Sequence, residues 1–300
     1  MTRRFKTVDV FTDCKFGGNQ LAVVLEAEGL SQDEMQSIAK EFNYAESTFV
    51  FPPEDPANTA WVRIFTPVAE VPFAGHPNVG TAYVLARMGE LFGKPLGDAL
   101  VFEETAGLVR IAIKTSAGEI VGAELCAPKV WQTRDAPPAK EIAACVGLTG
   151  GELDTSRHPP FIAGAGIDFA IAEVTDRDAL AAAWPDERAF AQFLPRSDAV
   201  GVYLYTPIET DGLDFQTRMF APKFGVSEDA ATGSAAVAFA GLQAHLAKAS
   251  SGTFSYRIGQ GYDLGRPSIL EAGATKEGGS VGETRVGGPC VSVMEGTLLG

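Results

Sequence analysis

Two short stretches of this 300-residue chain decide its expected fold: AGHPNVGTA at Ala74–Ala82 and ATGSAAVA at Ala231–Ala238. Each is a loop of small residues that opens an apolar, alanine-rich segment after an acidic, turn-forming stretch. Gly75 and Gly233 lie 158 positions apart, about half the chain, and a match at such spacing indicates an internal repeat. We therefore expect two similar halves, each presenting the N-terminus of a central helix to a shared cleft.

Short strands are expected on both sides of each stretch, because runs rich in β-branched and aromatic residues alternate with Gly, Pro or Ser turns. In the first half the expected strands are 5–12, 21–25, 47–51, 61–66, 99–104, 109–114 and 119–126. In the second half they lie near 161 and at 169–174, 200–205 and 215–220. Strands that follow one another without intervening helices favour an antiparallel, strongly curved sheet. The fold class expected is therefore α+β.

Helix boundaries can also be predicted. Ser31 and Glu34 form a capping box, in which each side chain bonds the backbone amide of the other, and the helix that they open runs to about Glu41. The remaining expectations are loops over 67–76 and 225–229, a linker over 128–138, and central helices over 77–88 and 233–249.

Charge narrows the classes of partner. The chain has 24 Lys and Arg against 38 Asp and Glu, a formal net charge of −14, with no long basic run. A surface this negative repels phosphate backbones and anionic lipid, so neither nucleic acid nor a membrane is expected as a partner. With 46% hydrophobic residues, the chain is able to bury a sizeable core.

The N-terminal sequence and the spacing of the cysteines indicate the cellular compartment in which the protein is expected. The basic start of the chain is not followed by an apolar run, so no secretory signal is expected, and no stretch has the ~20 apolar residues of a spanning helix. The four cysteines lie far apart without a C-x-x-C pair, which fits a reducing compartment. We expect a cytoplasmic protein.

The two helix starts are candidate anion sites. A helix N-terminus carries unpaired amides and a partial positive charge, so it binds carboxylates well. Gly75 and Gly233 suit this role, because glycine lets a ligand approach the backbone closely. The alternative is that both glycines serve only tight turns.

Three side chains near these loops are candidates for acid–base chemistry. Glu46 precedes an apolar strand, where an apolar pocket would raise its pKa toward neutrality and suit it as a proton-transfer base. His76 lies in an apolar loop, and Asp229 stands just before the second helix start, which also holds Ser234. The alternatives are a surface carboxylate for Glu46, a structural histidine for His76 and a helix-capping acid for Asp229.

Other kinds of site lack support in the sequence. Glu46, His76 and Asp229 do not have the spacing of helical or C-x-x-C metal ligands, so no metal is expected. No G-x-G-x-x-G follows an expected strand, and no Walker loop occurs. We therefore expect no nucleotide cofactor.

Several motifs together resemble the phenazine-biosynthesis PhzF-like family and occur in the family's order. They are VDVFT at Val8–Thr12, FGGNQLAVV at Phe16–Val24, AESTFV at Ala45–Val50, RIFTPV at Arg63–Val68 with Glu70, PFAGHP at Pro72–Pro77 with Gly80–Ala82, and EDAATGSA at Glu228–Ala235. The combination identifies the chain as similar to this family along most of its length.

The resemblance implies a diaminopimelate-epimerase-like fold, with two pseudo-symmetric halves that each wrap a curved, mostly antiparallel sheet or barrel around a central helix. The expected halves are 1–127 joined by 288–300, and 128–287, with the active site in the cleft between them. The resemblance further implies a homodimer and a cofactor-independent isomerase, typified by dihydro-3-hydroxyanthranilate isomerase.

The site residues implied by the resemblance fall on matching positions of this chain. Glu46 matches the proton-transferring glutamate, and His76 and Asp229 match residues that assist it. The residues expected to line the site of a small carboxylate substrate are Gly75, Gly233 and Ser234.

Three positions depart from the family's usual pattern. Ala45 stands where a serine often precedes the glutamate, so a hydroxyl that could bind substrate or orient Glu46 is missing. Gln20 and Ala230 each replace a frequent proline. Neither of these two replacements should abolish proton transfer, whereas Ala45 weakens the assignment of the phenazine substrate itself.

Two other functions stay open at this stage. The chain could be a non-catalytic protein that binds a small ligand on the same fold. It could also be an epimerase or racemase that uses two cysteines at the helix starts, but none of its four cysteines falls there.

Overall fold

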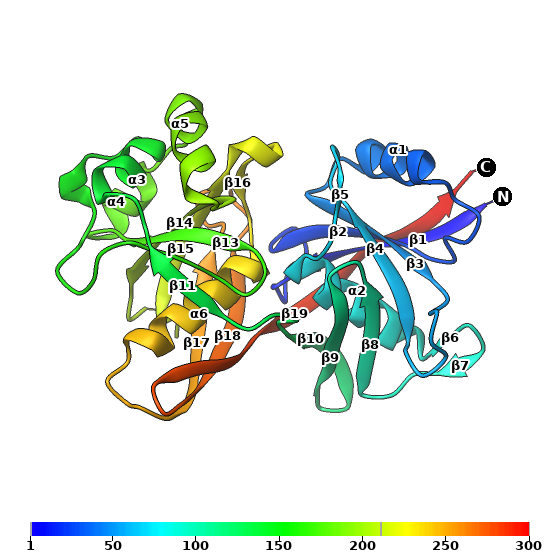
Figure 1. The fold of residues 1–300 in the computed structure, drawn as a ribbon. Helices are drawn as coiled ribbons and strands as arrows, with labels where there is room; N and C mark the ends of the chain where they lie inside the picture. The colour runs from blue at the N-terminus through cyan, green and yellow to red at the C-terminus, as the bar shows by residue number, and fades with distance from the viewer. Residues whose placement is uncertain (1, 211, 300) are drawn as a thin grey trace. The chain divides into compact units, whose positions relative to one another are not determined.

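A computed structural model describes residues 2–210 and 212–299 of the chain as a mixed α+β protein (Figure 1). Residues 1 and 300, which fall within the expected first half, lie outside this described part. The chain divides into two compact units: unit 1 comprises the chain up to Pro128 and from Gly287 onward, and unit 2 is Lys129–Val286. Each unit is described by itself.

Unit 1 contains two long helices and a set of strands. Its elements are β1 (Arg3–Val10), β2 (Asn19–Val24), α1 (Gln32–Phe42), β3 (Glu46–Phe51), β4 (Ala60–Phe65), β5 (Glu70–Val71), α2 (Gly75–Met88), β6 (Glu90–Leu91), β7 (Lys94–Pro95), β8 (Ala99–Glu104), β9 (Gly107–Ser116), β10 (Glu119–Cys126) and the later part of β19 (Ser280–Leu298).

The strands of unit 1 close into a ring of eight. β1 pairs with β2, β2 with β3, β3 with β4, β4 with β8, β8 with β9 and β9 with β10, and β19 pairs with both β10 and β1. Only β2–β3 and β4–β8 are parallel among the pairs whose register is known. The helix α2 lies inside this ring, in contact with β1, β2, β3, β9 and β10. A sheet closed in this way has no free edge among these strands.

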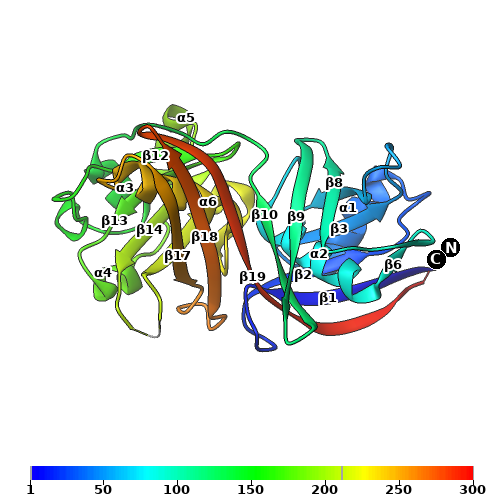
Figure 2. The same cartoon turned by 90° about the horizontal axis from the view of Figure 1, so that it is seen from below.

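Unit 2 contains the second long apolar helix. Its elements are β11 (Gln132–Asp135), α3 (Ala139–Cys145), a 3₁₀ turn (Gly150–Glu152), β12 (Phe161–Gly164), β13 (Asp168–Glu173), α4 (Arg177–Ala182), α5 (Glu187–Ser197), β14 (Gly201–Pro207), β15 (Phe215–Ala221), a 3₁₀ turn (Pro222–Phe224), β16 (Val226–Asp229), α6 (Gly233–Leu246), β17 (Gly252–Gln260), β18 (Ser268–Glu277) and the start of β19. Figure 2 shows β17 and β18 beside α6.

The strands of unit 2 repeat the pairing of unit 1 in the same order and directions. β12–β13 is antiparallel, β13–β14 parallel, β14–β15 and β15–β16 antiparallel, β15–β17 parallel and β17–β18 antiparallel. The corresponding series in unit 1 is β1–β2, β2–β3, β3–β4, β4–β5, β4–β8 and β8–β9. The internal repeat expected from two loops is thus a repeat of a whole sheet topology.

The two central helices are alike in length and surroundings. α2 and α6 each have 14 residues, and nearly all of their side chains are buried. A helix that is covered on every side needs small or apolar residues around its whole circumference. The alanines, valines and glycines of Gly75–Met88 and Gly233–Leu246 meet this requirement.

Several predicted elements are confirmed. The capping box of Ser31 and Glu34 opens α1, and Gly89 ends α2 in the left-handed conformation. The fold class is confirmed as mixed α+β, and the strands predicted over 99–104 and 119–126 have those bounds. Across the described residues, no helix is long and apolar enough to cross a membrane.

The predicted connections were partly wrong. α2 begins at Gly75 instead of 77, so His76 belongs to the helix and not to a loop. The predicted loops over 67–76 and 225–229 contain the strands β5 and β16, and the predicted linker contains β11. These strands exist because neighbouring strands pair with them, and their short or polar sequences have no strand pattern of their own.

Glycine allows α2 to lie close against the strands. A Cβ atom added at Gly80 would stand 2.6 Å from Leu21 Cδ2 and 2.7 Å from Val10 Cγ2. Gly241 plays the same part in α6, where an added Cβ would lie 2.3 Å from the ring of Trp131. The Trp131 indole nitrogen also donates to the Ala238 carbonyl oxygen at 3.0 Å, which fixes that ring over the helix.

Replacing Gly80 by alanine should therefore destabilise the protein. Overpacking a close-packed core costs about 1–3 kcal/mol in the free energy of unfolding. Urea denaturation of Gly80→Ala should show this loss, while Gly97→Ala, where an added Cβ meets nothing within 4 Å, should stay within ~0.5 kcal/mol of the wild type. Equal stabilities for the two variants would contradict the packing argument.

Candidate active site

Glu46 and His76 meet in unit 1. Glu46 is the first residue of β3, which pairs with β2 in parallel so that Glu46 stands opposite Leu21. His76 is the second residue of α2. The His76 Nε2 atom lies 3.4 Å from the Glu46 Oε2 atom, and the side chains are 4% and 19% exposed. A partly exposed carboxylate thus stands against a buried imidazole, an arrangement suited to proton transfer at the surface of unit 1.

His76 is held in its neutral form. Burial lowers its pKa from 6.5 to about 3, and a backbone hydrogen bond with Gln20 acts in the opposite direction. The buried Asn19 amide nitrogen lies 3.3 Å from the His76 Nδ1 atom. The other ring nitrogen, Nε2, faces Glu46 and makes no hydrogen bond within the described residues.

Gly75 opens α2 directly beside His76. The N-cap residue is Ala74, whose side chain has no acceptor, and no side-chain hydrogen bond caps this helix start. By contrast, α1, α4 and α5 are capped by Ser31, Asp176 and Asp186. An uncapped helix start leaves amide donors and a partial positive charge for another acceptor.

Asp229 organises the corresponding loop of unit 2. It receives a hydrogen bond of 2.7 Å from the hydroxyl of Thr232, the N-cap residue of α6. Gln260, which is fully buried, donates to the Asp229 backbone oxygen and to the Thr232 hydroxyl, and it accepts from the Thr232 amide. Gln260 was missed by the sequence analysis, because an isolated glutamine at the end of a strand gives no local signal.

Gly233 and Ser234 are the first two residues of α6. The Thr232 hydroxyl is bound to Asp229 and does not cap the helix, so this helix start also lacks a side-chain cap. Ser234 is partly exposed and holds the position in α6 that His76 holds in α2. Of the six predicted site residues, unit 1 brings together Glu46, Gly75 and His76, and unit 2 brings together Asp229, Gly233 and Ser234.

Matching arginine–glutamate pairs lie before the two helix starts. In unit 1, Arg63 of β4 makes two hydrogen bonds of 2.7 Å to Glu70 of β5. In unit 2, Arg218 of β15 makes bonds of 2.8 and 2.7 Å to Glu228 of β16. Each glutamate stands five residues before the glycine that opens its helix. Two-point pairing fixes geometry as well as energy, so each pair holds the short strand that leads into the loop.

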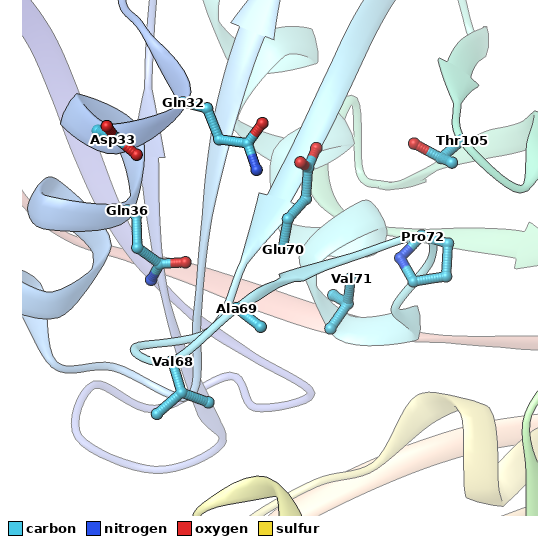
Figure 3. Close-up of a pocket in the computed structure, with 9 residues that line it drawn as sticks. All are labelled: Gln32, Asp33, Gln36, Val68, Ala69, Glu70, Val71, Pro72 and Thr105. Carbon is cyan, nitrogen blue, oxygen red and sulfur yellow. The ribbon is translucent and has the colours of Figure 1, made fainter.

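A cavity of about 610 Å³ lies elsewhere on unit 1, between α1 and the segment 68–72 (Figure 3). Its polar side chains are Gln32, Asp33 and Gln36 of α1, Glu70 and Thr105. None of the predicted site residues lines it. Two acidic groups and no basic one make it a poor site for a carboxylate.

Metal ligands do not gather in the structure. Across residues 2–210 and 212–299, no group of three or more His, Cys, Asp or Glu side chains is placed to hold a metal ion. Glu46 and His76 form a pair, and Asp229 has a hydroxyl partner.

Residues 8–296 match the family model PhzC-PhzF, described as phenazine biosynthesis-like protein. The chain belongs to this family. An uncharacterized isomerase of Mesorhizobium japonicum is 37% identical over 99% of both chains. The trans-2,3-dihydro-3-hydroxyanthranilate isomerase of Pseudomonas aeruginosa is 34% identical over 98% of both chains.

A solved structure supports the family at the level of the fold. A PhzF-family protein of Bacillus anthracis matches with a TM-score of 0.89 and 24% identity, covering 100% of this chain and 99% of its own. The relatives from Mesorhizobium japonicum, Pseudomonas aeruginosa and Clostridium acetobutylicum match over nearly their whole length and are named isomerases, so the predicted enzyme class is confirmed.

The buried neutral His76 should make stability depend on pH. Its pKa in the folded protein, about 3, lies below the unfolded value of 6.5, so the unfolded chain binds more protons between these values. This group should therefore lower the folding constant by about tenfold per pH unit as the pH falls below 6.5. The measurement is urea denaturation at pH 7, 6 and 5.

His76→Gln should remove this contribution, so its stability should fall less steeply on acidification than that of the wild type. The matched control is His245→Gln, which replaces an exposed histidine. A His76→Gln variant that loses stability with the wild-type slope would show that His76 is not buried in its neutral form.

Proposed function

We propose that this chain is a cofactor-independent isomerase that moves a proton within a small, unsaturated carboxylic acid. The observation that carries the proposal is the contact between Glu46 and His76 beside the uncapped start of α2. It places the Glu46 carboxylate, the neutral His76 ring and the backbone amides of a helix start without a side-chain cap close together in unit 1.

Glu46 is the group that transfers the proton. Its carboxylate removes a proton from a substrate carbon, and the electron pair left behind enters the adjoining π-system. The double bond shifts, and the carboxylic acid of Glu46 then returns the proton to another carbon of that system. The enzyme ends in its starting state, and the substrate keeps its composition.

His76 serves as a neutral polar group in this scheme. Its Nε2 atom lies 3.4 Å from the Glu46 Oε2 atom, so the ring can stabilise that carboxyl group between its two proton transfers or bind a polar group of the substrate. A pKa near 3 means that His76 stays uncharged at neutral pH, which keeps it from neutralising the carboxylate base by a full positive charge.

The helix starts supply the proposed carboxylate site. The amides at Gly75 in unit 1 and at Gly233 and Ser234 in unit 2 are placed at helix N-termini without a side-chain cap. In this proposal, which follows the family resemblance, both helix starts border one cleft between two pseudo-symmetric halves of a diaminopimelate-epimerase-like fold. Asp229 then holds or exchanges a proton on a polar group of the substrate.

The name of the relative from Pseudomonas aeruginosa suggests trans-2,3-dihydro-3-hydroxyanthranilate as the first substrate to test. The identity of 34% supports the reaction class more strongly than it supports the substrate. Ala45 lacks a hydroxyl beside Glu46, so the pocket around the substrate differs there from the usual family pattern. Other small unsaturated acids belong in the same assay.

Two alternatives make different predictions. A non-catalytic binding protein would retain the ligand without exchanging its protons. A two-cysteine epimerase would need thiols at the helix starts, where this chain has His76 and Gly233, while Cys145 and Cys290 are buried elsewhere. Burial raises the pKa of both thiols to about 12, which makes them poor acid–base groups at neutral pH.

The test is deuterium incorporation from D₂O into trans-2,3-dihydro-3-hydroxyanthranilate, followed by mass spectrometry and NMR. The wild type should isomerise the acid and introduce deuterium. Glu46→Gln should bind the acid but lose about 10²–10⁴-fold in turnover, because a positioned acid–base group contributes that much to rate.

Glu41→Gln is the matched control, since it removes a carboxylate from the exposed end of α1 and should keep full activity. Near-normal turnover by Glu46→Gln would overturn the role of Glu46. Binding without any exchange by the folded wild type, on this and other unsaturated acids, would favour the binding-protein alternative.

A further inference from the structure

A second carboxyl group lies close to the start of α2, and the proposed reaction does not use it. Glu104 is the last residue of β8, where the chain turns through residues 105–106 into β9. The Ala106 amide donates to the Pro72 carbonyl oxygen at 3.1 Å, which ties this turn to the segment leading into α2. Glu104 is only 9% exposed.

Glu104 lies beside Asn78, a fully buried residue in the first turn of α2. The Asn78 amide nitrogen donates to the carbonyl oxygen of the N-cap residue Ala74 at 2.9 Å. Among the described residues, no hydrogen-bond partner reaches the Asn78 Oδ1 atom or either carboxyl oxygen of Glu104. The Glu104 carboxyl group is therefore buried without a close hydrogen-bond partner, which is costly for its ionised form.

A proton on Glu104 removes this cost. A protonated carboxyl group carries no charge, whereas an ionised Glu104 would place a charge in this buried position without a close donor. Burial and the lack of a close partner thus favour the neutral acid.

Electrostatics point the same way. Burial raises the pKa of Glu104 from 4.5 to about 8, and the Asn78 side chain acts in the opposite direction. No charged neighbour contributes to this pKa. The other titratable side chains on the elements around Glu104 are His76, Tyr83 and Arg87 on α2, Arg63 on β4, Glu70 on β5, Glu103 on β8, and Arg110 and Lys114 on β9.

We propose that Glu104 is a positioning residue that is held as a neutral acid against Asn78 and keeps the start of α2 available to a substrate carboxylate. An ionised carboxylate at this place would itself occupy the positive end of the helix dipole and repel a second anion. The second half of this statement rests on the proposed carboxylate site, whereas the neutral state of Glu104 does not.

The direct test of the neutral state is infrared difference spectroscopy at pH 7. Wild type should show the carbonyl stretching band of a buried neutral carboxylic acid, and Glu104→Gln should lose that band. The control is Glu103→Gln on the same strand, whose carboxylate accepts bonds from the Glu54 and Asp55 amides and from Asn58. That control should keep the band, and identical spectra for all three proteins would overturn the proposal.

The link to binding is tested by calorimetric titration with anthranilate at pH 7, 8 and 9. If binding requires the protonated Glu104, the Kd of the wild type should rise toward tenfold per pH unit above pH 8. Glu104→Gln, which cannot ionise, should bind with a Kd that does not change with pH. Equal pH dependence in both proteins would overturn the positioning role.

Stability gives a third measurement that does not depend on any ligand. Because the pKa of Glu104 in the folded protein exceeds the unfolded value of 4.5, its contribution to stability is lost as the pH rises from 4.5 to 8. The melting temperature of Glu104→Gln, measured relative to that of the wild type, should therefore rise as the pH increases across this range. Glu103→Gln should show no such gain.

These readouts separate two kinds of failure. If wild type binds no anthranilate at any pH, the carboxylate site and the positioning role both fail. The infrared band and the pH-dependent stability then still decide whether Glu104 is neutral.

Discussion

Complete enclosure of two helices is the constraint on which this structure depends. α2 and α6 have no solvent-facing side, so nearly every residue along them has to be small or apolar. Polar chemistry on these helices is then confined to the ends, where backbone amides leave the hydrogen-bonded ladder. His76 and Ser234 both stand at the second position of their helix.

Around the helix starts, arginine–glutamate pairs hold the backbone rigid. The pairs Arg63–Glu70 and Arg218–Glu228 each make two parallel hydrogen bonds at the same distance from a helix-opening glycine. Arg218 also donates to three carbonyl oxygens at the end of α4, which leaves little freedom for its guanidinium group. A loop fixed in this way presents its amides in one geometry and has less entropy to lose when a ligand arrives.

The sequence predicted the elements that depend on local patterns. The capping box at Ser31, the glycine stop at Gly89 and most strands could be found because a few adjacent residues determine them. β5 and β16 were missed, since two residues, or the polar run VSED, become a strand only by pairing with the strand that precedes them. Glu46 and His76 were singled out by motif, but their contact depends on the parallel pairing of β2 with β3 and could not be measured from spacing. Glu104 gave no signal, because a strand-end glutamate is usually solvated.

The 19-residue strand β19 has a consequence for the order in which the protein can be made. Its first residues belong to unit 2, and its last residues pair with β1, with Leu298 opposite Arg3. During synthesis the ring of unit 1 lacks one of its strands until β19 has been translated. The facing edges of β1 and β10 stay unpaired while all of unit 2 is translated, and unpaired strand edges are prone to aggregation.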